Sequence, residues 1–132
     1  MQAYFPRNFD ALEDIFAFSA SFFERHRLAA SLKFAVDVAL EELVTNMIKY
    51  SPEGTHDIFV DLSVNDDCII IQLVDKDVEP FDITASKAVD IKQPLNERTP
   101  GGLGLHFVKK MMDNIKYEYE NRESKITLVK NI

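Results

Sequence analysis

Hydrophobic residues recur along the chain with two spacings, which predict a mixture of helices and strands. The clearest helical pattern runs from Val36 to Tyr50, where the apolar positions fall on one broad face at about 100° per residue. These positions are Val36, Ala39, Leu40, Leu43, Val44, Met47 and Ile48. Glu42, Asn46 and Lys49 lie together on roughly the opposite side. We therefore expect a helix with one packed face and one polar face.

Two further helices are predicted. Asn8 or Asp10 is placed to cap a helix that runs to about His26, and its apolar positions are typical of a packed face. They are Leu12, Ile15, Phe16, Phe18, Phe22 and Phe23. A break around Arg27 to Ser31 separates this helix from the central one. The third helix is expected over Leu103 to Asn114, directly after a cluster of glycines.

Strands are predicted where apolar and polar residues alternate, or where short apolar runs are bounded by turn residues. The expected strands are Gln2 to Phe5, Ile58 to Val64, Cys68 to Asp75, Ile115 to Glu120 and Lys125 to Val129. Tight connections at Asn65 to Asp67 and Asn121 to Ser124 make two hairpins. This order of elements predicts one domain over residues 1–132, an α+β two-layer sandwich of a mostly antiparallel sheet with three helices on one face.

The segment between the first hairpin and the third helix has no regular pattern. A long irregular segment in a compact domain is usually functional or mobile. It ends in Gly101, Gly102, Leu103 and Gly104, where the free N–H groups of a helix start suit a phosphate. The missing Cβ atoms also let an anion approach the backbone. A flexible turn into the helix is the alternative interpretation of these glycines alone.

Composition limits the possible partners and location of the protein. The formal net charge of −7 argues against nucleic acid as a partner, because its phosphates would be repelled. A single cysteine, Cys68, excludes an internal disulfide and is consistent with the cytoplasm. The N-terminus has no secretory pattern, and no stretch approaches the length that spans a bilayer. We expect a cytoplasmic protein that binds neither nucleic acid nor a membrane.

The polar face of the central helix carries candidate chemistry. Glu42 and Asn46 are one turn apart, so the carboxylate can activate a water or hydroxyl while the amide oxygen binds Mg²⁺. Lys49, about one further turn along, can reach a phosphate. For this helix taken alone, an ordinary solvated polar face is the alternative interpretation.

Several separate segments together resemble the GHKL ATPase superfamily. They are EELVTNMIKYS on the central helix, Asp75 with Pro80-Phe81-Asp82 behind it, TPGGLGLHFVKKMMDNIKYE, and SKITLVK. Within the superfamily they look most like the small anti-sigma regulatory factors and serine-protein kinases with a histidine-kinase-like ATPase domain. The resemblance covers about Leu32 to the C-terminus and implies the GHKL (Bergerat) fold. The segment GGLGLHFVKKMMD and the strands after it are its most distinctive part.

The resemblance also implies roles for individual positions. Asn46 matches the Asn that coordinates the Mg²⁺ bound with ATP, and Glu42 matches the acidic residue that acts as general base. Lys49 occupies a place where related proteins can have a basic phosphate contact. Gly102 and Gly104 match the glycine box that opens the helix beneath the phosphates.

One family box is altered in this sequence. The family typically has Asp-x-Gly followed by x-Pro-Phe, in which the Asp accepts a hydrogen bond from the adenine amino group. An ungapped alignment on Pro80-Phe81 places Lys76 at the Asp and Val78 at the Gly, and a Lys cannot accept a hydrogen bond. After a local shift, Asp75 or Asp77 could serve as the acceptor instead.

The resemblance implies an ATP- and Mg²⁺-dependent anti-sigma factor and serine kinase of a bacterial partner-switching system. Such a protein would bind a sigma factor and phosphorylate a Ser of an anti-sigma antagonist, with residues from about 83 to 100 as the ATP lid. The altered adenine box favours an alternative, a non-catalytic regulatory module with weak or lost ATP binding that sequesters a protein partner. A homodimer is a further expectation from the resemblance.

Overall fold

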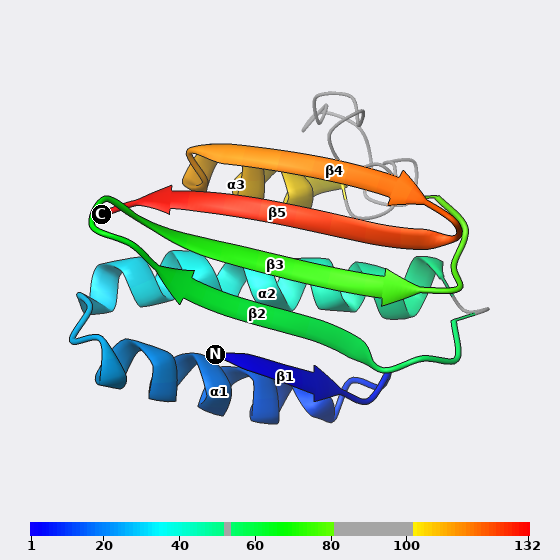
Figure 1. Cartoon of the computed structure of the whole chain (residues 1–132), viewed down its shortest axis with the longest axis horizontal. Helices are drawn as coiled ribbons and strands as arrows, with labels where there is room; N and C mark the ends of the chain where they lie inside the picture. The colour runs from blue at the N-terminus through cyan, green and yellow to red at the C-terminus, as the bar shows by residue number, and fades with distance from the viewer. Residues whose placement is uncertain (52–53, 81–101) are drawn as a thin grey trace.

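A computed structural model of the chain describes residues 1–51, 54–80 and 102–132. Within these residues the chain forms three helices and five strands. In chain order they are β1 (Gln2–Phe5), α1 (Ala11–Arg25), α2 (Ala30–Tyr50), β2 (Ile58–Val64), β3 (Cys68–Lys76), α3 (Gly102–Met111), β4 (Asn114–Glu120) and β5 (Glu123–Asn131). Each predicted helix and strand is present (Figure 1), which confirms the predicted α+β arrangement.

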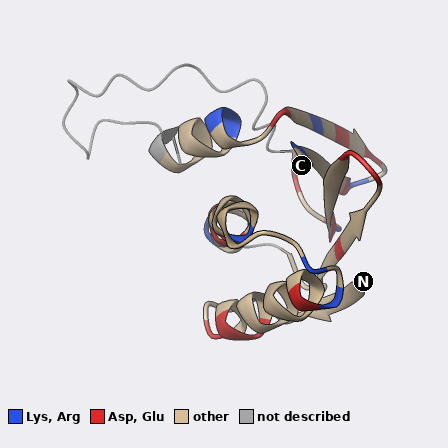
Figure 2. Ribbon diagram, turned by 90° about the vertical axis from the view of Figure 1, so that its left-hand side faces the viewer, with Lys and Arg blue, Asp and Glu red and all other residues tan. Residues whose placement is uncertain are grey.

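The strands form one sheet in the order β1-β2-β3-β5-β4, and every neighbouring pair is antiparallel. The hairpins β2–β3 and β4–β5 are therefore joined through β3 and β5, which pair along the whole of both strands. All three helices lie on the same face of the sheet (Figure 2). The result is the two-layer sandwich that the sequence predicts.

The core lies between this face and the helices, and alternation along the strands explains it. In β3, Ile71 and Leu73 are fully buried, while Ile70 and Gln72 next to them are only half-buried. The apolar stripe of α2 faces these strands, and its fully buried members include Val36, Ala39, Leu40 and Val44. Burying one Leu or Ile side chain contributes about 1.5–3 kcal/mol. This contact therefore fixes the position of α2 against the sheet.

Some element boundaries differ from the predicted ones. The central helix begins at Ala30, inside the break expected around Arg27 to Ser31, after the left-handed residue Arg27 (φ 53°) and the extended residue Ala29. The third helix ends at Met111 rather than Asn114, because Asn114 already pairs with Val129 in the sheet. Boundaries of this kind depend on pairing between distant segments, which the local pattern does not contain.

The start of α1 distinguishes the two predicted caps. Asn8 Oδ1 accepts a hydrogen bond from the backbone N–H of Ala11 at 3.0 Å. Asp10 occupies the position before the helix but makes no side-chain cap hydrogen bond. Asn8 is therefore the residue that satisfies a free N–H group of this helix.

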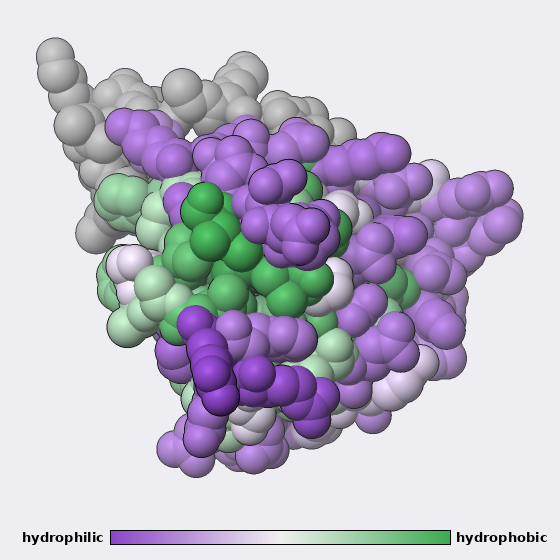
Figure 3. Space-filling view, turned by 60° about the vertical axis from the view of Figure 1, so that its left-hand side comes forward, coloured by the Kyte–Doolittle hydropathy of each residue, from purple (hydrophilic) through white to green (hydrophobic). Residues whose placement is uncertain are grey.

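Apolar surface also remains open outside the core. Among the described residues, the large apolar side chains that stay exposed are Tyr4, Phe9, Phe34, Phe107 and Ile132. Figure 3 shows apolar surface framed by hydrophilic side chains on one face of the molecule. Of the helices in the described ranges, none has both the length and the apolar character needed to cross a membrane.

Candidate functional site

The predicted base and metal ligand meet where α2 contacts the start of α3. Asn46 Nδ2 donates a hydrogen bond to Glu42 Oε1 at 3.2 Å, and Asn46 is only 4% exposed. Gly104 lies in the first turn of α3, and a Cβ built there would lie 1.9 Å from Glu42 Cδ. Only a glycine leaves room for the carboxylate in this position. The polar face of α2 is therefore partly covered by α3 and is not an ordinary solvated face.

The surroundings of Glu42 change its acidity. Partial burial raises the pKa of the Glu42 carboxyl above its ordinary value, because the charged form loses water. The hydrogen bond from Asn46 and the positive charge of Lys49 oppose this rise, while the neighbouring Glu41 adds to it. A carboxylate whose pKa is raised is a better proton acceptor than an ordinary exposed one.

Asn46 fits the role of a magnesium ligand. Its Nδ2 is used by Glu42, and within the described residues no donor reaches its Oδ1. An amide oxygen is a ligand that Mg²⁺ accepts, and this ion usually keeps waters and phosphates as its other ligands. The described part of the chain holds no group of three or more His, Cys, Asp or Glu that could bind a metal by itself. A site with one protein ligand does not need such a group.

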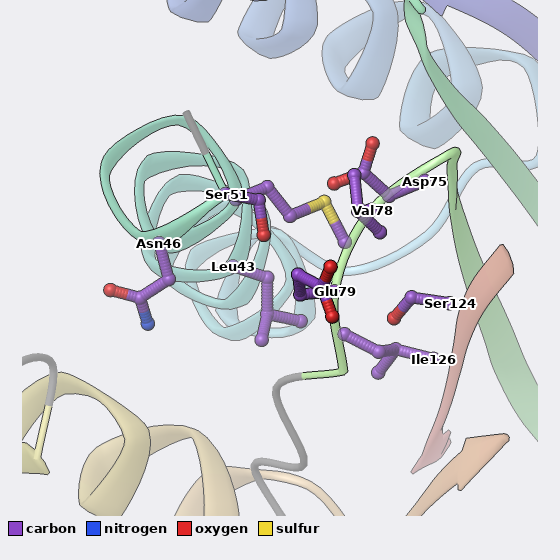
Figure 4. A pocket seen from close by; sticks show the side chains of 9 residues that line it. Leu43, Asn46, Ser51, Asp75, Val78, Glu79, Ser124 and Ile126 are labelled. Carbon is purple, nitrogen blue, oxygen red and sulfur yellow. The ribbon is translucent and has the colours of Figure 1, made fainter. Parts of the chain in front are cut away.

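A small cavity lies on the other side of Asn46, between α2 and the sheet (Figure 4). Its wall is formed by three parts of the chain, namely α2, the end of β3 with the residues after it, and β5. The lining residues are Leu43, Asn46, Met47, Ser51, Asp75, Val78, Glu79, Ser124 and Ile126. The enclosed space is about 20 Å³, room for about one water molecule. A purine base does not fit into this space unless part of the wall moves.

Asp75 is the buried one of the two acidic residues that line this cavity, the other being the exposed Glu79. Asp75 is 1% exposed, and Arg7 Nη2 donates a hydrogen bond to its Oδ1 in a buried ion pair. Arg7 Nη1 also donates to the carbonyl of Met47 at 3.0 Å. The guanidinium lies against Gly54, where an added Cβ would be 2.5 Å from Arg7 Cζ. Arg7 therefore ties the end of β3 to α2.

Val78 is held in the cavity wall by the β4–β5 turn. Its N–H donates to the carbonyl of Arg122 at 3.0 Å, and Tyr119 Oη donates to its carbonyl at 2.7 Å. Arg122 also forms ion pairs with Asp77 and Glu79, both at 3.0 Å. These contacts keep the Val78 side chain, which is 1% exposed, in the cavity wall.

The structure brings together only some of the predicted site residues. Glu42, Asn46 and Gly104 meet as described above, and Asp75 lines the cavity that Asn46 also borders. Three of the predicted residues are exposed, namely Lys49, Lys76 and Asp77. Of the two aspartates beside Lys76, only Asp75 is buried and lines the cavity. Gly102 and Leu103 begin α3. Gly101 and the predicted lid from about residue 83 to 100 lie outside the described residues.

Sequence reasoning missed Arg7 and Gly54. An isolated Arg after a predicted strand and a single Gly in a turn carry no local sign of a shared contact. Arg7 and Asp75 are 68 positions apart along the chain. The inward direction of Asp75 did have a signal in the sequence, because Asp75 continues the inward alternation of Ile71 and Leu73 along β3.

Removal of Arg7 is expected to destabilise the fold. Arg7→Ala leaves the buried carboxylate of Asp75 without its cation, and breaking a buried pair on one side typically costs about 3–5 kcal/mol. The measurement is the free energy of unfolding in urea. Arg25→Ala, which removes an exposed arginine of α1, is the matched control and should stay within about 0.5 kcal/mol of the wild type. An equal small effect of both changes would show that the pair contributes little.

Comparison with known proteins defines the class of this protein. Residues 5–130 match the family model described as histidine kinase-like ATPase domain. That match covers nearly the whole chain, so the protein belongs to this family. The family assignment agrees with the fold. No curated protein matches the sequence significantly.

Solved structures resemble the fold at low sequence identity. The RsbU and RsbW domains of Rv1364c from Mycobacterium tuberculosis match 98% of this chain with a TM-score of 0.67 and 12% identity. This chain spans only 31% of that longer chain. In the SiaB–SiaC complex from Pseudomonas aeruginosa, a match covers 100% of this chain and 89% of the other, with a TM-score of 0.62 and 15% identity. At these identities the matches show the fold.

Proposed function

We propose that this chain is an ATP- and Mg²⁺-dependent anti-sigma factor and serine kinase of a bacterial partner-switching system. One observation carries the proposal. Glu42, a partly buried carboxylate with a raised pKa, lies beside the buried Asn46 and against Gly104 at the start of α3. A purely structural helix pair would have no need for this group of polar residues and a glycine. Membership in the histidine kinase-like ATPase family supports ATP as the ligand.

Each residue of this group has a role in the proposed reaction. Glu42 accepts the proton of a serine hydroxyl, which makes the oxygen a better nucleophile. Asn46 would hold Mg²⁺ through Oδ1, and the ion would supply positive charge that neutralises the phosphates. The first turn of α3 offers free N–H groups to phosphate oxygens, as helix starts do. Lys49, exposed at the end of α2, contributes positive charge nearby. Catalysis of this kind depends mainly on positioning and electrostatics.

The proposed partners are proteins. A sigma factor would be bound, and an anti-sigma antagonist would be phosphorylated on a Ser. The similar SiaB chain was solved in a complex with a second protein, SiaC, which supports a protein partner for this chain also. We further propose one domain over residues 1–132, a place in the cytoplasm, and a homodimer as a possible assembly.

A second candidate function is favoured by the cavity. Asp75 is engaged by Arg7, Val78 fills the wall, and the space left is about 20 Å³. These features fit a non-catalytic module that binds ATP weakly or not at all and regulates a partner by sequestering it. The two functions differ in whether a partner is phosphorylated.

Phosphate transfer to a protein tests the proposed function. The purified chain is incubated with Mg²⁺, γ-labelled ATP and a soluble extract of the cells that produce it, and labelled phosphoserine is located by mass spectrometry. The proposal predicts one strongly labelled small protein with the wild type and none with Glu42→Gln. A partner that is captured equally with and without ATP, and is never phosphorylated, would favour the non-catalytic module.

The raised pKa of Glu42 predicts a particular pH dependence. A general base must be deprotonated, so transfer should fall on acidification as the pH passes the pKa of Glu42. Because burial raises this pKa, the fall should begin at a higher pH than for an exposed glutamate. The measurement is the rate at saturating ATP against pH. A rate that stays flat down to the ordinary range of a glutamate would contradict the assignment.

A further inference from the structure

The turn between β4 and β5 has an unusual residue in one of its two central positions. Glu120 and Glu123 pair directly across the turn, so its central residues are Asn121 and Arg122. Both are left-handed, with φ of 52° and 61°, as in a type I′ turn. Asn-Gly is the preferred sequence for such a turn, because a side chain disfavours the left-handed backbone. The arginine is therefore present at a cost to the turn itself.

The side chain of Arg122 reaches the segment that follows β3. Its Nε donates a hydrogen bond to Asp77 Oδ1 and its Nη1 donates one to Glu79 Oε1, both at 3.0 Å. Its carbonyl accepts a hydrogen bond from the N–H of Val78, and Tyr119 Oη donates to the carbonyl of Val78 at 2.7 Å. A single exposed ion pair contributes little, but here all the contacts hold the same three residues. Tyr119 and Arg122 thus form a clasp that ties this segment to the β4–β5 hairpin.

The clasp keeps one side of the cavity closed. Val78 and Glu79 line the cavity, and Figure 4 shows them on the short segment after β3, which passes between α2 and β5. With this segment held in place, the enclosed space is about 20 Å³, room for about one water molecule. A nucleobase is many times larger than a water molecule. A base is therefore kept out of this cavity while the clasp is intact.

The phosphate side of the site is built from other elements. Glu42, Asn46 and Gly104 belong to α2 and α3, whereas the clasp joins the β4–β5 hairpin to the end of β3. Mg²⁺ and phosphate oxygens need only the group on the two helices. Binding of the triphosphate is therefore compatible with a closed cavity, but recognition of the base inside the cavity is not.

We propose that the clasp makes this chain bind the Mg²⁺-associated triphosphate of a nucleotide without selecting its base. This inference rests on the proposed binding of ATP, and it widens the ligand class to nucleoside triphosphates in general. Tyr119 and Arg122 are the residues that determine this specificity, although neither is part of the phosphate side. Release of the clasp frees Val78 from the cavity wall, so that the cavity can enlarge and contact a base.

The test is a calorimetric titration of ATP, GTP and UTP, each with Mg²⁺, because these nucleotides differ only in the base. The wild type should bind all three with dissociation constants within about 3-fold of one another. In the double variant Tyr119→Phe with Arg122→Gly, the constants should spread by about 10-fold or more, since an opened cavity makes at least one contact with the base. At least one nucleotide should also bind more tightly than to the wild type.

Two features of the variants keep this test clean. The glycine suits the left-handed position of Arg122, so the hairpin should remain folded without the clasp. Lys116→Ala is the matched control, because it removes an exposed ion pair with Glu118 on the same hairpin. This control should bind the three nucleotides as the wild type does. If the double variant does not fold, Arg122→Gly alone decides the question.

The possible outcomes separate the inference from the proposed function. A wild type whose affinities for the three nucleotides differ by about 10-fold or more overturns the inference and leaves the proposed function standing. A folded variant without the clasp that remains as unselective as the wild type has the same consequence. If the wild type binds none of the three nucleotides, both the inference and the proposed function are wrong.

Discussion

Glu42→Gln is expected to lower phosphate transfer by about 10²–10⁴-fold, the usual contribution of a general base. The glutamine keeps the size of the side chain and can still accept the hydrogen bond from Asn46 that holds Glu42 at 3.2 Å. What it loses is the ability to take a proton. Binding of ATP should therefore change little, since the amide remains beside Asn46. The measurement is the transfer rate at saturating ATP, together with the ATP dissociation constant.

Glu41→Gln is the matched control for this change. Glu41 is the neighbouring residue on α2, carries the same charge and is exposed. The Glu41→Gln change should leave the transfer rate almost unchanged. It should lower the pKa of Glu42 slightly, because the charge of Glu41 contributes to raising that pKa. Transfer that is equally fast in Glu42→Gln and in the wild type would remove Glu42 from the mechanism.

Gly104→Ala is expected to reduce transfer nearly as much as the loss of Glu42. The new Cβ would lie 1.9 Å from Glu42 Cδ and 2.1 Å from both carboxylate oxygens, so the carboxylate must move. Because these atoms are the end of a flexible side chain, the movement itself strains the fold little. A base displaced by about 1 Å loses much of its effect. Activity should fall steeply, while the thermal midpoint of unfolding changes little.

A double variant separates displacement of Glu42 from other effects of the alanine. If Gly104→Ala acts through Glu42, combining it with Glu42→Gln should lower the rate no further than Glu42→Gln alone. If the two losses multiply, then Gly104 acts independently, for instance by altering the phosphate contacts at the start of α3. That result would contradict the proposed contact between the two helices.

The fold was largely predictable because its elements have strong local patterns. The apolar stripe of α2 and the alternation in β2 and β3 follow from the spacing of hydrophobic residues. Local patterns do not determine the order of the strands in the sheet. The placement of β5 between β3 and β4 depends on the pairing of β3 with β5, which are far apart in the sequence. Only the family resemblance carried that information.

The site was predictable to a smaller degree, and the reason is physical. Asn46 was expected on a polar face, but its burial depends on how α3 docks against α2, which no local pattern specifies. The same holds for the pair of Arg7 and Asp75, whose members are far apart in the sequence. By contrast, the inward direction of Asp75 follows from the two-residue alternation of β3 and could have been predicted. Asp77 lies beyond the end of the strand in a left-handed conformation (φ 58°), which the alternation does not specify.

The most direct test of the central claim, a nucleotide site built on α2, is calorimetric titration with ATP and Mg²⁺. It compares the wild type with Asn46→Ala, up to millimolar ATP. We expect saturable binding that the variant weakens about 10- to 100-fold, as changes around a metal site commonly do. The expected loss should shrink when Mg²⁺ is replaced by EDTA, because Asn46 acts through the ion. Equal affinity of both proteins, or no binding by the wild type, would contradict the claim.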